Sequence, residues 1–443
     1  MNQTTNISFP QWLVFGLACL LLVFAPLIRA GNTGFALLVM QLLGLGILLV
    51  LGWWGLYRHR FPTAVWWFLI GSIGLVGLYL VPIPESLWRA LPGRALYVDV
   101  YDWLGESGQR DLYLAVSLIP ANTAYSLMAL LPPLGIFLAV GCLDKRQLVS
   151  VVYLFLGVAA LQAGIGLTQY SAGFSDSASG SYPNRDHFSA FMAMAFPLAF
   201  GLAAYHVGRH TGHHDEDTGV LEHKLNRVLV FASLTLLLLL AGIFSRSRAG
   251  VALMLLGILL SSLMFARHIG GKRSASLMAT LSTIGGGIAA SIGLIPVLNR
   301  FMQANPADDL RWYLFDTSFR GIQQFFPFGS GPGTFADIYR ALQPLGQTGG
   351  FVNNAHNDYL ELLFDTGLVG GVIIVGMLLL YLYGWWQLRQ QAWEQTRFLK
   401  AGAGIGMLLV LLHAYVDFNF HIPANALFFA FLAGLFLRVE RKR

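Results

Sequence analysis

Apolar stretches of about 20 residues recur along the whole chain, and this is the length that a helix needs to cross the hydrocarbon core of a bilayer. Apolar residues make up 56% of the chain and charged residues 11%, a composition that excludes an ordinary soluble protein. We therefore expect an all-α integral membrane protein, with a single membrane domain filling residues 1–443. The pattern predicts about twelve transmembrane helices, at residues 12–28, 36–57, 63–81, 124–142, 148–168, 187–206, 228–244, 250–266, 277–298, 363–383, 401–416 and 422–437.

The basic residues are divided unevenly between the two sides of this predicted domain. With a cytoplasmic N-terminus, the inner loops hold 17 of the 28 Lys and Arg residues, including every Lys, and the outer loops hold 11 Arg. The positive-inside rule then places both termini in the cytoplasm and explains the high pI without a nucleic-acid partner. Because Arg is the better bidentate partner for phosphate and carboxylate, the outer Arg residues indicate an outward-facing anion site. The alternative is that they pair with outer Asp and Glu residues.

Three predicted connections are long. The largest, residues 299–362, is expected to be a partly helical periplasmic loop that bears part of the active site, with a helix near 309–324 and a Gly/Pro-rich turn at 327–335. The outer loop 82–122 carries amphipathic stretches and is expected to lie along the membrane surface. The inner loop 208–227 is rich in His and acidic residues, but its spacing favours a solvated loop over a metal site.

The segment SRSRAG, which ends at Gly250, opens the eighth predicted span from the outer side. The first turn of a helix has unpaired N–H groups and the positive end of the helix dipole, and Ser245 or Ser247 can cap it. Arg246 and Arg248 add positive charge there, and Gly250 would leave space for a ligand. These features predict a phosphate or diphosphate site. The alternative is that both Arg side chains only anchor the helix end at the membrane interface.

A second polar segment, NNAHNDYLELL, leads into the tenth predicted span. Asn353 or Asn354 is expected to cap this helix. His356 lies at its outer start and can exchange a proton near neutral pH, which makes it a candidate general base. A lone His at a membrane boundary can also be an ordinary interfacial residue, so its polar neighbours favour the functional interpretation.

These segments together resemble the bacterial O-antigen ligase and O-antigen polymerase families. His356 and Asn357, followed after nine residues by GLVG, match the family pattern H-[NSQ]-x9-G-x-x-G. The SRSRAG segment, the PNRDHF segment before the sixth span, and the long outer loop with Arg311 and Arg320 are also similar to those families. The resemblance covers roughly residues 181–420, and four ordered motifs with consistent membrane placement make it specific.

The resemblance implies an inverting glycosyltransferase of the bacterial inner membrane. It would move a glycan from undecaprenyl diphosphate to an acceptor sugar hydroxyl at the periplasmic face, without a metal or another cofactor. Arg246 and Arg320 would bind the diphosphate, Arg248 and Arg311 would support them, and His356 would accept the proton of the acceptor hydroxyl. Further substrate contacts are expected from Asn184, Arg185, His187, Asn357, Tyr359 and Glu361.

The acceptor distinguishes the two activities of these families. A ligase attaches the finished glycan to lipid A-core, as in lipopolysaccharide biosynthesis, whereas a polymerase extends the glycan on its own lipid carrier. The HNDYLELL and PNRDHF segments are most similar to members found with exopolysaccharide genes, which slightly favours a polymerase. A transporter or flippase is the alternative from another class. It would be expected to carry ionisable residues near the membrane midplane or broken helices in paired repeats.

Overall fold

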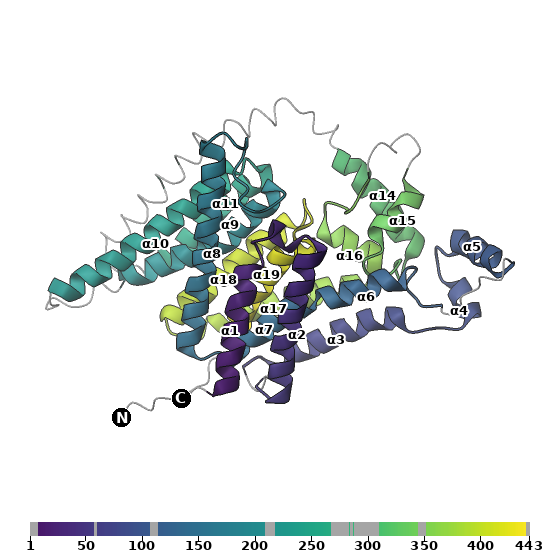
Figure 1. The fold of residues 1–443 in the computed structure, drawn as a ribbon, viewed down its shortest axis with the longest axis horizontal. Coiled ribbons are helices and arrows are strands. Elements are labelled where there is room, and N and C mark those ends of the chain that lie inside the picture. The colour runs from purple at the N-terminus through teal and green to yellow at the C-terminus, as the bar shows by residue number, and fades with distance from the viewer. Residues whose placement is uncertain are drawn as a thin grey trace.

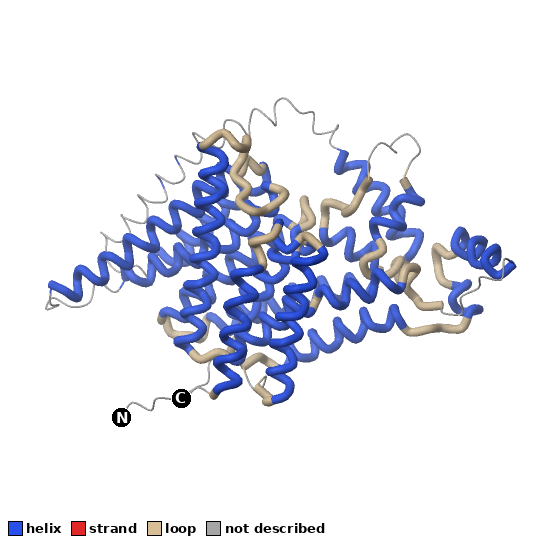
Figure 2. The backbone as a smooth tube through the Cα atoms, viewed as in Figure 1, coloured by secondary structure: helices blue, strands red, loops and turns tan. Residues whose placement is uncertain are grey.

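The structure is a computed structural model. It describes residues 8–56, 60–106, 114–208, 218–266, 310–343 and 351–439 and the isolated positions 283 and 287. The described residues form an assembly of helices without a β-strand (Figure 2). The α-helices are α1 Phe9–Phe24, α2 Gly34–Trp53, α3 Thr63–Gly77, α4 Glu85–Ala90, α5 Ala95–Glu106, α6 Pro120–Ala129, α7 Leu131–Cys142, α8 Lys145–Ser171, α9 Arg185–Gly208, α10 Thr218–Phe244, α11 Arg248–Phe265, α14 Leu310–Phe325, α15 Phe335–Leu342, α16 Asp358–Thr366, α17 Leu368–Leu388, α18 Gln395–His413 and α19 Pro423–Leu437.

The predicted all-helical membrane fold is confirmed in its main features. Within the described part of the chain, nine helices are long and apolar enough to cross a membrane. Two shorter apolar helices, α1 and α19, coincide with the first and last predicted spans. Apart from positions 283 and 287, the predicted span at 277–298 lies outside the described residues, so the total of twelve stays a prediction. Parts of the loops predicted at 208–227 and 299–362 also lie outside them.

Helix α9 runs through the centre of the bundle, and almost all of its side chains are buried. Glycines on two neighbouring helices allow a close approach to it. A Cβ atom at Gly250 of α11 would lie 2.3 Å from Ser189 Oγ, and one at Gly402 of α18 would lie 2.7 Å from the carbonyl oxygen of Pro197. Membrane helices associate through such small residues because lipid gives them little hydrophobic drive to pack. The starts of α9 and α11 are thereby held in a fixed arrangement.

Both ends of the described chain lie at one end of the bundle, which we call the terminal face. Near the start of α1, Gln11 Nε2 donates a hydrogen bond to the carbonyl oxygen of Cys142, 3.0 Å away, at the end of α7. Directly after α19, Arg438 Nη1 donates to the carbonyl oxygen of Val140, also at 3.0 Å. The contacts at the end of α7 therefore bring the first and last described helices to the same face.

The opposite end of the bundle is the site face. Lys400, near the start of α18, donates to the carbonyl oxygen of Arg438 at the terminal face. Helix α18 then crosses the bundle and ends at His413, which marks the site face. Beside it, helices α14, α15 and α16 form a small helical subdomain, seen in Figure 1 as the green helices. This subdomain has its own apolar core, made of Phe325, Phe335, Ile338, Tyr339, Ala355 and Phe364.

The entry into the tenth predicted span differs from the prediction in two ways. Asn357, and not Asn353 or Asn354, caps α16, because its side-chain oxygen accepts hydrogen bonds from the backbone N–H groups of Tyr359 and Leu360. The span also does not begin at residue 363. Gly367 separates α16 from α17 with φ 53° and ψ −128°, a backbone conformation that favours glycine. A short helix therefore precedes the membrane helix.

Candidate active site

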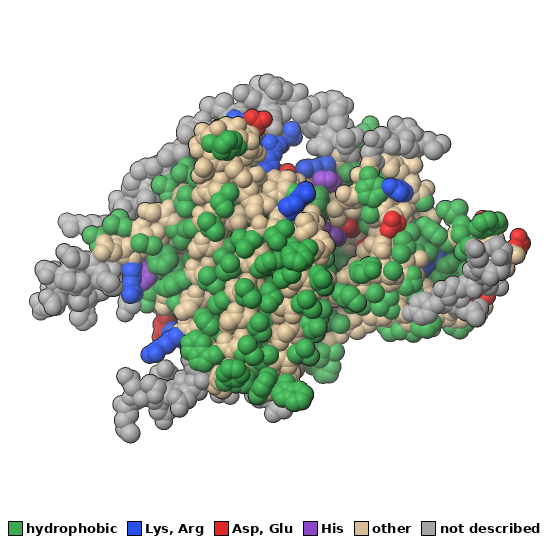
Figure 3. Space-filling view, viewed as in Figure 1, with side chains coloured by type: hydrophobic (Ala, Val, Ile, Leu, Met, Phe, Trp, Pro, Cys, Tyr) green, Lys and Arg blue, Asp and Glu red, His purple; other side chains and the backbone are tan. Residues whose placement is uncertain are grey.

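A cavity of about 190 Å³ opens at the site face. Its lining residues are Arg185, Asp186, Arg248, Ala249, Arg311, His413, Val416 and Asp417. The three arginines come from three different helices: Arg185 and Arg248 are the first residues of α9 and α11, and Arg311 is the second residue of α14. Figure 3 shows Arg and His side chains gathered at the top of the view, above a flank of apolar side chains. The cavity thus joins segments far apart in the sequence.

The helix starts make this cavity suitable for an anion. Ser247 Oγ accepts a hydrogen bond from the backbone N–H of Gly250 at 3.0 Å. Of the two serines predicted as caps, Ser247 is therefore the one that caps α11. Asn184 Oδ1 accepts from the backbone N–H of Asp186 at 2.8 Å, at the start of α9. Both helices thereby direct the positive ends of their dipoles towards the cavity, where an anion is stabilised. The arginines add full positive charges to these partial ones.

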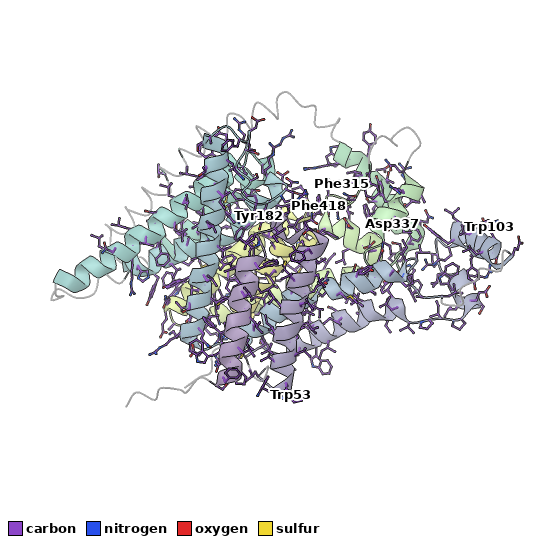
Figure 4. The ribbon with its side chains drawn as sticks, viewed as in Figure 1. Trp53, Trp103, Tyr182, Phe315, Asp337 and Phe418 are labelled. Carbon is purple, nitrogen blue, oxygen red and sulfur yellow. The ribbon has the colours of Figure 1, made fainter. Side chains whose placement is uncertain are left out.

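Asp417 lies between two histidines at the edge of the cavity. Its Oδ1 is 3.3 Å from His356 Nδ1 and its Oδ2 is 3.5 Å from His187 Nε2. The side chains of Asp417 and His187 are both 2% exposed, whereas that of His356 is 34% exposed. The ring of Phe418, labelled in Figure 4, packs edge-on against both imidazoles. His356 is therefore the member of this group that solvent or a substrate can reach.

The surroundings of Asp417 keep its carboxyl group ionised. Burial by itself raises the pKa of this group, but the contacts with His187 and His356 outweigh burial and hold the pKa well below its ordinary value. A carboxylate at this position favours a proton on the facing nitrogen of each histidine. For His356 that nitrogen is Nδ1, which leaves Nε2 as the acceptor.

His413 was not foreseen as a site residue. It ends α18, is 1% exposed and lines the cavity, and neither of its ring nitrogens has a hydrogen-bond partner in the structure. A buried polar group without a partner is costly unless a ligand or water satisfies it. His413 can therefore contribute a hydrogen bond to a molecule bound in the cavity.

The backbone around His356 is strained. His356 has a φ of 51°, in the left-handed region that non-glycine residues seldom adopt. Glu361 Oε2 accepts a hydrogen bond from the backbone N–H of Ala355 at 2.7 Å, and its Oε1 accepts from Asn354 Nδ2 at 3.1 Å. The carboxylate of Glu361 thus holds the residues before His356, and this packing supports a conformation that would otherwise cost free energy.

The structure does not bring all the predicted arginines together. Arg246 has a φ of 55° and its guanidinium lies 5.5 Å from the ring centroid of Tyr170. Arg320 is exposed on α14 and pairs with Asp316 one helical turn away. Neither lines the cavity, whereas Arg248 and Arg311, predicted as supporting residues, do so together with Arg185. Helical spacing explains part of this result, because Arg311 and Arg320 project from different sides of α14.

The other predicted contact residues have structural partners. Asn184 and Asn357 hold helix starts, as described above. The hydroxyl group of Tyr359 donates to the carbonyl oxygen of Leu411 at 2.7 Å, which ties α16 to α18. The side chain of Glu361 faces the backbone before His356. Gly250, expected to leave room for a ligand, instead lies against Ser189, so that prediction is wrong and the glycine serves helix packing.

Residues 233–375 match the family model described as O-antigen ligase. The matched segment includes α11, Arg311 and His356 and so covers much of the site just described. No curated protein matches the chain. Within the described residues, no group of three or more His, Cys, Asp or Glu side chains is arranged to hold a metal ion. The match supports the O-antigen ligase and polymerase family that the motifs of the sequence indicated.

Proposed function

We propose that this chain, as a member of the O-antigen ligase and polymerase family, transfers a glycan from a polyprenyl diphosphate to a hydroxyl group of an acceptor sugar. The observation that carries the proposal is the cavity at the site face. There, the first turns of three helices supply Arg185, Arg248 and Arg311, and the pair His356–Asp417 lies at the edge of the cavity. A cationic cavity beside a half-buried imidazole suits a diphosphate leaving group next to a hydroxyl nucleophile.

The arginines would bind the diphosphate of the donor. During transfer the bond between the anomeric carbon and the phosphate oxygen breaks, and negative charge develops on the departing diphosphate. Guanidinium groups and helix N-termini stabilise that charge without having to reorganise. His413, which also lines the cavity, would add a hydrogen bond. The polyprenyl chain stays in the bilayer, so the cavity must lie at the membrane interface, as expected at the N-terminal starts of the apolar helices α9 and α11.

His356 would act on the acceptor. Asp417 orients the imidazole through Nδ1, and Nε2 accepts the proton of the acceptor hydroxyl as its oxygen forms a bond with the anomeric carbon. The products are the extended glycan and the free polyprenyl diphosphate. Because the nucleophile attacks from the side opposite the leaving group in one step, the anomeric configuration is inverted. We further propose that the terminal face is cytoplasmic and that the site face opens to the periplasm of a bacterial inner membrane.

The test is transfer by the purified protein in lipid nanodiscs, supplied with glycan linked to undecaprenyl diphosphate. In one reaction the lipid-linked glycan is the only substrate, so it must serve as both donor and acceptor. A second reaction also contains lipid A-core as an acceptor. Glycan chains that lengthen on the lipid carrier identify a polymerase, and transfer to lipid A-core identifies a ligase. Nuclear magnetic resonance of the new linkage reports its anomeric configuration. Movement of intact donor across a liposome membrane without any new glycosidic bond would instead identify a flippase and refute the proposal.

A further inference from the structure

A second ionisable group lies next to the proposed site and takes no part in the chemistry proposed above. His421 Nδ1 lies 2.9 Å from Asp358 Oδ1, and His421 Nε2 lies 3.0 Å from Glu361 Oε1. We call these three side chains the ion cluster. The two carboxylates are about 5% exposed and His421 is 41% exposed. Two buried carboxylates on the same helix face repel each other unless a cation lies between them, and His421 occupies that position.

The ion cluster joins the two segments that carry the catalytic pair. In the segment before α16, Glu361 Oε2 accepts a hydrogen bond from the backbone N–H of Ala355, the residue directly before His356. On the other side, Asp358 Oδ2 accepts the backbone N–H of Phe420 at 3.1 Å, three residues after Asp417. Asp358 N also donates to the carbonyl oxygen of Ala414 at 2.9 Å. The segment before α16 and the connection between α18 and α19 are therefore held in register by groups that do not line the cavity.

We propose that His421 is a positioning residue that locks the segment bearing His356 to the connection bearing Asp417. Both of its ring nitrogens must carry protons to donate to the two carboxylates at once. When His421 is neutral, one carboxylate loses its partner, the two acidic groups repel, and the hydrogen bonds to the backbone of Ala355 and Phe420 weaken. The His356–Asp417 separation of 3.3 Å is then no longer fixed.

The charges around His421 agree with this role. Burial lowers the pKa of His421, but the charge of Glu361 and the contact with Asp358 outweigh burial and raise this pKa well above its ordinary value. Asp365, also on α16, adds a further acidic neighbour. The pKa of Asp358 is raised by burial and lowered by His421, with burial the larger effect. The ion cluster is thus expected to stay intact at neutral pH and to lose its lock in alkali.

Two substitutions separate charge from shape at this position. His421→Gln keeps a side chain that can donate and accept hydrogen bonds but removes the charge. His421→Arg keeps a positive charge and has room to extend, since His421 is partly exposed. His206→Gln is the control substitution. His206 is a buried histidine near the C-terminal end of α9, away from the cavity at the start of that helix, and its ring stacks on Phe231. All three variants are compared with the full-length wild-type protein in nanodiscs.

The first measurement is hydrogen–deuterium exchange of the peptides that contain Ala355 and Phe420, and it requires no turnover. We expect faster exchange in both peptides in His421→Gln, protection close to wild type in His421→Arg, and no local change in His206→Gln. Unchanged exchange in both peptides of His421→Gln would overturn the proposed lock. Because this measurement is independent of catalysis, it gives a result even if the chain proves not to transfer glycans.

The second measurement, which presupposes the proposed function, is the rate of transfer as a function of pH. Misplacement of a catalytic group by about 1 Å can lower a rate by about 100-fold, so we expect kcat of His421→Gln to fall about 10- to 100-fold with KM for the donor nearly unchanged. In the wild type, kcat should decline in alkali as His421 loses its proton. In His421→Arg this decline should move to higher pH. The positioning role of His421 would be overturned if kcat declined at the same alkaline pH in the wild type and in His421→Arg. It would also be overturned if His206→Gln lost as much kcat as His421→Gln.

Discussion

The Nδ1 atom of His356 lies 3.3 Å from Oδ1 of Asp417, although the two residues belong to segments on either side of α16, α17 and α18. A carboxylate in this position fixes the tautomer and the orientation of an imidazole, as in other His–carboxylate pairs. The proposed general base therefore has a partner outside the segment that matches the O-antigen ligase family model.

Asp417→Asn should lower kcat by about 100-fold or more, within the range that general acid–base catalysis contributes. The amide keeps the shape of the side chain but removes the charge that favours a proton on Nδ1 of His356. Affinity for the donor lipid should change little, because the arginines remain. Turnover and donor binding are measured on the same preparation. A kcat close to wild type would show that Asp417 does not orient the base.

The arginines divide into two matched pairs. Arg248→Lys and Arg311→Lys keep the charge but lose the planar fork, so each should lower kcat/KM by about 100-fold or more. Arg246→Lys and Arg320→Lys change residues that lie outside the cavity and should retain activity within about threefold, since their contacts are with Tyr170 and Asp316. The four variants are assayed side by side at equal expression. The reverse order of losses would restore Arg246 and Arg320 as the diphosphate ligands.

Stability should depend on pH through His421. Its pKa in the folded protein is raised above the value of about 6.5 expected for an unfolded chain. The contribution of His421 to stability is therefore fully present below about pH 6.5 and is lost as pH rises through the folded pKa. The melting temperature of the wild type should fall between neutral and alkaline pH, and that of His421→Gln should fall less. Parallel curves for the two proteins would show that His421 gains no stability from its carboxylates.

The orientation of the chain can be tested with two equally exposed residues. Trp53, at the end of α2, and Phe174, after α8, are each 84% exposed. In a protein lacking Cys19 and Cys142, a membrane-impermeant maleimide should label Phe174→Cys in intact spheroplasts. It should label Trp53→Cys only after the membrane is permeabilised. The opposite pattern would place the site face in the cytoplasm, where a periplasmic transfer reaction is impossible.

Much of the fold was predictable because membrane helices need long apolar sequences. The capped helix start at Ser247 was also predicted, from its position before an apolar helix. Where the prediction failed, the cause is a tertiary contact between segments that are distant in the sequence. Gly250 lies against Ser189 because two helices approach closely, and a one-dimensional pattern does not distinguish room for a helix from room for a ligand. The break at Gly367 depends likewise on the nearby turn after α14.

The site itself was only partly predictable. Arg248, Arg311 and His356 belong to recognisable motifs, but nothing in those motifs ranked Arg248 above Arg246, since that choice depends on the turn that directs each side chain. His413, the last residue of α18, and Asp417, which follows that helix, were missed because they lie outside every motif considered. A signal was nevertheless present in the sequence HAYVDFNFH, residues 413–421, which separates two apolar helices. Ionisable groups within or between membrane helices usually have a function.

The most direct test of the central claim is the affinity of the cavity for undecaprenyl diphosphate itself, measured by thermophoresis in nanodiscs. Arg311→Lys is compared with the wild type, and Arg320→Lys, on the same helix, is the control. We predict that Arg311→Lys binds at least about tenfold more weakly, because a lost hydrogen bond to a charged group costs about 1.5–3 kcal/mol and about 1.4 kcal/mol is a factor of ten. Arg320→Lys should bind as tightly as the wild type. Equal affinity in all three proteins would contradict the assignment of this cavity to the donor diphosphate.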